Sequence, residues 1–144
     1  MRVLVVEDEQ HLAEGLRFNL EAEGFDVTVR ENGEDALAEF SGGKPHYDLM
    51  VLDVMMPEID GFTLCAELRQ HSDVPIVMLS ALNRPDDIVY GFSLGADDYI
   101  CKPFTFREIE ARLSAILRRV SLKNERVETH VMSLNDVVLN DELH

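Results

Sequence analysis

The sequence has no tryptophan, only two cysteines, and fewer than half as many basic as acidic residues. Cys65 and Cys101 do not have the spacing of a metal-binding motif, so we expect free thiols in a reducing compartment. Thirteen Lys and Arg stand against 28 Asp and Glu, a formal net charge of −15. This imbalance argues against direct binding of nucleic acid and favours a cation or a basic partner surface.

Long apolar runs are also missing, because the longest apolar stretches have the length of a single strand. Met1 and Arg2 lead directly into a strand pattern rather than into a signal peptide. We therefore expect a cytoplasmic protein with no membrane partner. Apolar residues make up 46% of the 144 residues, which is enough for the packed core of a domain of ordinary size.

Short apolar runs alternate along the chain with amphipathic stretches of helical length. Strands are predicted at residues 2–6, 25–30, 48–53, 75–81 and 98–102, and helices at 10–23, 33–41, 57–70, 86–94 and 105–119. Five such units in a row predict an α/β protein with a parallel sheet and helices on both faces. Ligand sites in such sheets lie beyond the carboxyl ends of the strands.

Chemically active side chains stand at these strand ends. Glu7 and Asp8 follow the first strand, Asp53 ends the third, Ser80 ends the fourth and Lys102 ends the fifth. If these positions converge, three carboxylates share one rim, and their repulsion must be offset. Clustered carboxylates without histidine suit a hard divalent cation, so we expect Mg²⁺ or Mn²⁺ there.

Four motifs match a known family in order and spacing: "VVEDE" (5–9), "VLDVMMPEIDGF" (51–62), "VMLSA" (77–81) and "GADDYICKPF" (95–104). Across residues 1–120 the chain resembles the receiver domain of bacterial two-component response regulators, most closely the OmpR/PhoB-type subfamily. The resemblance implies a five-stranded, doubly wound, flavodoxin-like (βα)5 fold with strand order 2-1-3-4-5. It also implies a phosphorylation-activated switch rather than an enzyme, limited to self-phosphorylation and autodephosphorylation.

The resemblance also implies a role for each matching residue. Asp53 would accept a phosphoryl group from a sensor histidine kinase and form a 4-aspartylphosphate. Asp8, Asp53 and the backbone carbonyl of Met55 would hold the metal, with Glu7 acting through water. Lys102, before a cis proline, would pair with the phosphate.

Two further residues match the positions of the family's switch, and four match its dimer face. Ser80 would bind the phosphoryl group and draw the following loop inward, while Tyr99 moves between exposed and inward rotamers. An activated homodimer would form through the fourth helix, the fifth strand and the fifth helix, with charges at Asp98, Glu108, Arg112 and Arg119. Less typical residues on this face leave the dimer geometry open and leave Glu108 without its usual basic partner; they are Ile88, Tyr90 and Ser93.

The tail differs in composition from the first 120 residues. Residues 121–130 are polar and predict a linker, while residues 131–144 resemble the first strands of a winged-helix DNA-binding domain. We expect that the chain is part of a transcriptional regulator whose DNA-binding output is absent here. A stand-alone receiver with a disordered tail is the alternative.

A second alternative is a Mg²⁺-dependent phosphohydrolase with an aspartyl-phosphate intermediate. Enzymes of the haloacid-dehalogenase type usually carry an acid/base aspartate two residues after the nucleophile. Here that position holds Met55, which argues against turnover.

Overall fold

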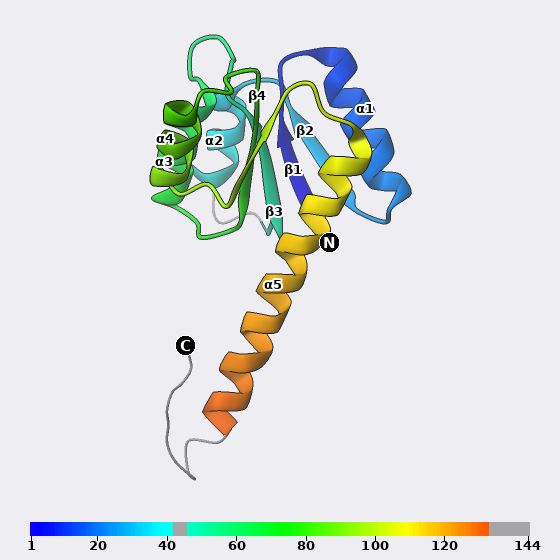
Figure 1. Ribbon diagram of the computed structural model, residues 1–144, viewed down its shortest axis with the longest axis vertical. Coiled ribbons are helices and arrows are strands. Elements are labelled where there is room, and N and C mark those ends of the chain that lie inside the picture. The colour runs from blue at the N-terminus through cyan, green and yellow to red at the C-terminus, as the bar shows by residue number, and fades with distance from the viewer. Residues whose placement is uncertain (42–45, 133–144) are drawn as a thin grey trace.

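The computed structural model describes residues 1–41 and 46–132. Its five strands are β1 (Arg2–Val6), β2 (Asp26–Arg30), β3 (Leu49–Asp53), β4 (Ile76–Ser80) and β5 (Asp98–Cys101). Its five helices are α1 (Gln10–Ala22), α2 (Gly33–Ser41), α3 (Gly61–Arg69), α4 (Pro85–Ser93) and α5 (Phe106–Met132). The strands form one parallel sheet in the order β2-β1-β3-β4-β5 (Figure 1), which confirms the predicted fold.

Helices cover both faces of the sheet. The α1 and α5 helices lie together over one face, where Leu16 and Leu113 pack against β1 and β5 side chains. The α2, α3 and α4 helices lie over the other face, where Leu64 and Leu68 join the core (Figure 1). All residues of β3 and β4 are buried, as expected for strands with helices on both sides.

Two helices begin where a carboxylate caps the first turn. Glu9 accepts a hydrogen bond from the Leu12 backbone N–H and starts α1, as the sequence predicts. Asp60 accepts one from the Thr63 N–H at 2.8 Å, so α3 starts at Gly61, inside the stretch 57–70 that is predicted to turn into a helix. The residues before Asp60 form a loop, with Glu58 at a positive φ of 66°.

The α5 helix extends well beyond its predicted end at residue 119 and runs to Met132. It includes the backbone of residues 121–130, which contain neither glycine nor proline to end a helix. The role of this stretch as a linker between domains stays a prediction. Most of the predicted winged-helix start at 131–144 lies outside the described residues.

Along residues 1–41 and 46–132, no helix combines the length and apolar character that a membrane span needs. Cys65 and Cys101 are free thiols, as the sequence predicts.

Candidate functional site

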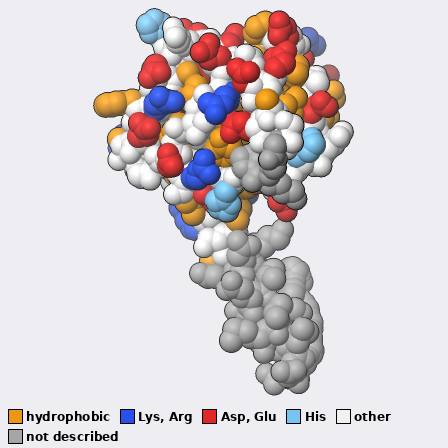
Figure 2. Space-filling view, turned by 180° about the vertical axis from the view of Figure 1, so that it is seen from behind, with side chains coloured by type: hydrophobic (Ala, Val, Ile, Leu, Met, Phe, Trp, Pro, Cys, Tyr) orange, Lys and Arg blue, Asp and Glu red, His pale blue; other side chains and the backbone are white. Residues whose placement is uncertain are grey.

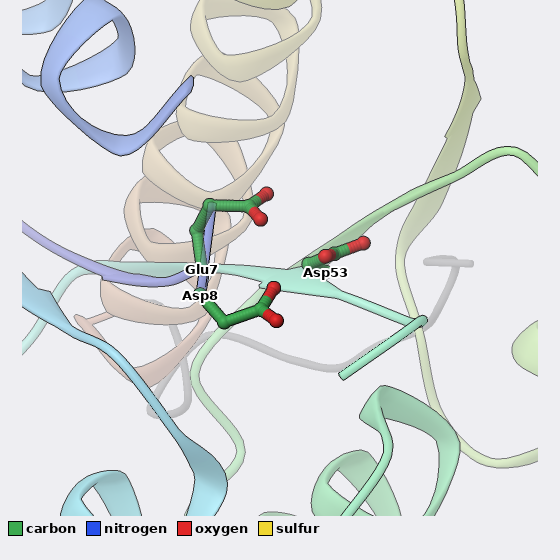
Figure 3. A group of neighbouring side chains, drawn as sticks. All are labelled: Glu7, Asp8 and Asp53. Carbon is green, nitrogen blue, oxygen red and sulfur yellow. The ribbon is translucent and has the colours of Figure 1, made fainter. Parts of the chain in front are cut away.

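Three carboxylates meet where β1 and β3 end. One oxygen from each of Glu7, Asp8 and Asp53 lies within 4.8 Å of the others (Figure 3). Glu7 and Asp8 stand in the turn between β1 and α1, and the Glu7 N–H donates to the Arg30 carbonyl at 3.0 Å. Figure 2 shows further acidic side chains along the same end of the molecule. The predicted convergence of these three residues is therefore present in the structure.

Glu7 is the most deeply buried of the three acids, with 1% of its surface exposed. Burial raises the pKa of Glu7 from its ordinary value of 4.5 to about 8, and the nearby charge of Asp53 adds to this rise. A hydrogen bond from the Glu9 N–H to Glu7 Oε2, at 3.0 Å, opposes the shift. Glu7 Oε1 is buried and has no hydrogen-bond partner among the described residues.

These features fit a divalent cation. The donors are all carboxylate oxygens, which Mg²⁺ prefers. An orphaned oxygen on a buried acid is costly unless a cation or a water bound to one satisfies it. Asp8 is exposed, so the cluster is open to solvent on one side, and Mg²⁺ retains several of its waters.

Lys102 approaches the cluster from the end of β5. Its Nζ lies 3.4 Å from Asp53 Oδ1, and its backbone N–H donates to the Ser80 carbonyl at 2.7 Å. The Lys102–Pro103 peptide bond is cis, as the resemblance implies. Asp53, 3% exposed, also accepts a hydrogen bond from the Met55 N–H at 3.3 Å. The ammonium and the cation site therefore flank the same carboxylate.

The loop after β4 connects Ser80 with Tyr99 through Leu82. Ser80 Oγ accepts a hydrogen bond from the Leu82 N–H at 2.9 Å, and the Tyr99 hydroxyl donates to the Leu82 carbonyl at 2.8 Å. Tyr99 is buried, and burial raises the pKa of its phenol. The structure shows the inward rotamer, and movement between two rotamers stays a prediction. Sequence reasoning did not single out Leu82, which acts here through its backbone alone.

Gly61 allows the loop after Asp53 to fold back on its own strand. The Gly61 N–H donates to the Val54 carbonyl at 2.8 Å. A Cβ at position 61 would lie 2.6 Å from the Val54 Cα, which no real side chain tolerates. Glycine at this position therefore keeps α3 close to the end of β3.

The sequence pattern of the family described as "Response regulator receiver domain" matches residues 3–114. The chain belongs to this family. It is related to OmpR/PhoB-type transcription regulators, and the family's members are signalling receivers rather than classical enzymes.

Two curated proteins and one solved structure illustrate the relationship. The receiver is 44% identical over 128 residues to "Probable transcriptional regulator ycf27" of Cyanidium caldarium, covering 89% of this chain and 51% of that protein. It is 44% identical over 139 residues to "Alkaline phosphatase synthesis transcriptional regulatory protein PhoP" of Bacillus subtilis (strain 168), covering 91% and 57%. The Francisella response regulator 1452 receiver domain superimposes with a TM-score of 0.77 at 35% identity, covering 83% of this chain and 98% of that one. The receiver thus spans only about half the length of these curated relatives.

Three of the four charged residues predicted for the dimer face form ion pairs within the receiver. Arg112 Nη1 lies 3.1 Å from each carboxylate oxygen of Asp98, and Arg112 Nε lies 3.5 Å from Glu108 Oε2. Glu108 therefore pairs with a basic residue on its own helix, and the absence of its usual basic partner across the dimer face stays a prediction. Arg119 is exposed on α5 and takes no part in these ion pairs.

Apolar side chains lie exposed on α4 near this charged group. Val89, Tyr90 and Phe92 are exposed, whereas Ile88 is half-buried and packs against the core. The Tyr90 ring contacts Phe62 of α3 edge-on, with centroids 4.9 Å apart. Sequence periodicity did not decide which of these residues face inward.

Proposed function

We propose that this receiver is cytoplasmic and accepts a phosphoryl group on Asp53 from a sensor histidine kinase. The arrangement of Asp53 supports this role, because it lies between a cation-binding pair of acids and the Lys102 ammonium at 3.4 Å. In the reaction, an Asp53 oxygen bonds to phosphorus while the bond from phosphorus to the kinase histidine breaks. Such transfers depend mainly on positioning and charge neutralisation.

Asp8, Asp53 and the Met55 carbonyl would hold Mg²⁺ or Mn²⁺, with Glu7 acting through water. A bound cation would supply positive charge to the phosphoryl group. Lys102 would supply a second positive charge, because its Nζ lies 3.4 Å from Asp53 Oδ1. The Ser80 hydroxyl, buried at the end of β4, donates a hydrogen bond to a third oxygen.

Phosphorylation would act on a transcriptional output through the α4-β5-α5 face. The exposed apolar residues of α4 and the charges at Asp98, Glu108, Arg112 and Arg119 support homodimer formation there. The names of the ycf27 and PhoP relatives describe transcriptional regulators, and the receiver covers only part of them. We therefore assign DNA binding to a C-terminal domain beyond this chain.

Intact-mass spectrometry after incubation with acetyl phosphate tests the acceptor. We expect one phosphoryl group per chain, only with Mg²⁺ or Mn²⁺, and none on Asp53→Asn. Asp60→Asn is the matched control, because Asp60 caps α3 nearby and is expected to be labelled like wild type. Full labelling of Asp53→Asn at another residue would contradict the assignment.

The same samples separate a switch from a phosphohydrolase. A switch domain takes up one phosphoryl group per chain and, when incubated with small phosphate esters, produces free phosphate only slowly. Steady, many-fold turnover by wild type, abolished in Asp53→Asn, would instead favour the hydrolase.

A further inference from the structure

The backbone of α4 touches the ring of Tyr99 at Gly91. A Cβ at position 91 would lie 2.9 Å from Tyr99 Cδ2, 3.1 Å from Cε2 and 3.2 Å from Met78 Sδ. Carbon atoms in contact are normally separated by about 3.5–4.0 Å. The ring can therefore occupy this position only because residue 91 has no side chain.

The other end of the same ring is fixed by the β4–α4 loop. The Tyr99 hydroxyl donates to the Leu82 carbonyl at 2.8 Å, and the Leu82 N–H donates to Ser80 Oγ at 2.9 Å. Ser80 in turn receives the Lys102 N–H on its carbonyl. A continuous series of contacts thus joins Gly91, through Tyr99 and Leu82, to Ser80 at the phosphorylation site.

Gly91 also connects this series to the surface. It is buried on the inner side of α4, between Tyr90 and Phe92, whose rings are exposed on the outside. Glycine inside a helix lowers helix stability relative to alanine, so its presence at position 91 needs a packing reason.

We propose that Gly91 is a positioning residue that holds Tyr99 in its inward rotamer before any phosphoryl group binds. The missing side chain leaves space for the ring, and the ring orders the loop that carries Ser80. Its effect on activation rests on the proposed function, since it acts through the phosphoryl-binding serine. Its effect on the Tyr99 ring does not.

The test is Gly91→Ala in the full 144-residue chain. The new methyl group would lie closest to Tyr99 Cδ2, at 2.9 Å, and Met78 on its other side is fully buried, so we expect the Tyr99 ring to be displaced. We expect the Tyr99 ring to become more exposed to solvent. NMR of ¹³C-labelled tyrosine with a solvent paramagnetic probe measures this exposure. Ser93→Ala, on the exposed side of the same helix, is the control and should leave the Tyr99 signal unchanged.

A double-mutant cycle with Tyr99→Ala gives a result whose sign decides the proposal. With Tyr99 present, Gly91→Ala should lower the urea midpoint, because the methyl group and the ring compete for space. Without the ring, the same change should raise the midpoint, because alanine favours helix more than glycine does. If Tyr99→Ala does not fold, Tyr99→Val serves instead, because its side chain ends before the ring positions that contact residue 91. An equal rise in both backgrounds, or an unchanged Tyr99 signal, would overturn the proposal.

Beryllofluoride binding, measured by calorimetry in the presence of Mg²⁺, connects the result to activation. We expect wild type to bind it and Gly91→Ala to bind it at least several-fold more weakly. If wild type does not bind beryllofluoride, the proposed function is contradicted. The double-mutant cycle still tests the contact between Gly91 and Tyr99 in that case. Equal affinity in both proteins would overturn the proposed link between Gly91 and Ser80.

Discussion

Glu7 and Asp8 are adjacent carboxylic acids, yet they differ in burial and in protonation. Asp8 is exposed, whereas Glu7 is buried and carries an unpaired oxygen. Since removal from water disfavours the charged form, the pKa of Glu7 rises to about 8 and the acid holds a proton at neutral pH in the absence of metal. A bound cation would reverse this preference, so cation binding by this site is expected to release a proton.

The first prediction concerns the stability of the metal-free chain against pH. The folded state holds a proton on Glu7 that the unfolded chain releases above pH 4.5, so wild type loses stability as pH rises from 4.5 to about 8. Glu7→Gln has no titrating group at this position. Its free energy of unfolding relative to wild type should therefore increase by about 1 kcal/mol per pH unit in that window. Urea denaturation with EDTA at several pH values measures it.

Glu14→Gln is the control for this comparison, because Glu14 is an exposed acid on α1. Its stability relative to wild type should not change over the same range. A constant difference between Glu7→Gln and wild type from pH 5 to pH 8 would show that Glu7 is charged throughout.

The second prediction concerns competition between Lys102 and the cation. The Lys102 ammonium and a cation on Asp53 would repel one another, since Nζ lies 3.4 Å from Asp53 Oδ1. Lys102→Met should therefore bind Mg²⁺ about tenfold more tightly by calorimetry, while Asp53 is labelled more slowly by acetyl phosphate. Lys102→Arg should retain wild-type Mg²⁺ affinity. Weaker Mg²⁺ binding by Lys102→Met would contradict the charge argument.

At the scale of elements, Arg69 joins the end of α3 to two loops. Its guanidinium donates to the carbonyls of Gly95, Ser72 and Val74, and to Asp97 Oδ2 at 2.9 Å. The same Asp97 oxygen accepts the Ile76 N–H at 2.8 Å, at the start of β4. One side chain thus donates hydrogen bonds to backbone carbonyls in the loops that lead into both β4 and β5.

The third prediction follows from these bonds. Arg69→Met should lower the free energy of unfolding by about 2–4 kcal/mol, because it leaves several partly buried carbonyls unpaired. Arg118→Met, on the exposed side of α5, should change it by less than about 0.5 kcal/mol. Equal unfolding midpoints for the two variants would mean that water replaces the Arg69 bonds at no cost.

The elements also show what sequence reasoning could and could not predict. The strand ends that carry Asp53, Ser80 and Lys102 were predictable, because parallel strands bring their carboxyl ends together. The length of α5 was not, because sequence polarity alone does not distinguish a helix from a linker. The roles of Arg69 and Gly91 depend on contacts between elements, which no local pattern contains.

At the scale of the whole molecule, the surface of α4 differs from the rest of an acidic protein. Val89, Tyr90 and Phe92 expose apolar area on one short helix, which packs on the β5 strand that carries Asp98. Large exposed apolar side chains on one element are candidates for a site of association. The high net negative charge otherwise opposes contact between two copies.

The fourth prediction is that beryllofluoride with Mg²⁺ converts the monomer to a dimer in sedimentation velocity. Phe92→Ser should abolish the dimer, because Phe92 is 45% exposed on α4. Phe18→Ser is the matched control, because Phe18 is 73% exposed on α1, a helix that is not part of the α4-β5-α5 face. A wild-type monomer at high concentration, or equal loss of dimer in both variants, would count against the α4-β5-α5 face.

The interior place of β1, between β2 and β3, has a consequence for how the chain reaches this structure. The first strand pairs with β2 on one side but with β3, through Val3 and Leu49, on the other. During synthesis, the earliest segment therefore stays half-paired until residues more than forty positions later leave the ribosome. Such long-range pairing is slow, and an open strand edge invites wrong partners. The strand that closes this edge is the one that ends at Asp53, so β1 loses its open edge in the same step that places the Asp53 carboxylate next to Glu7 and Asp8.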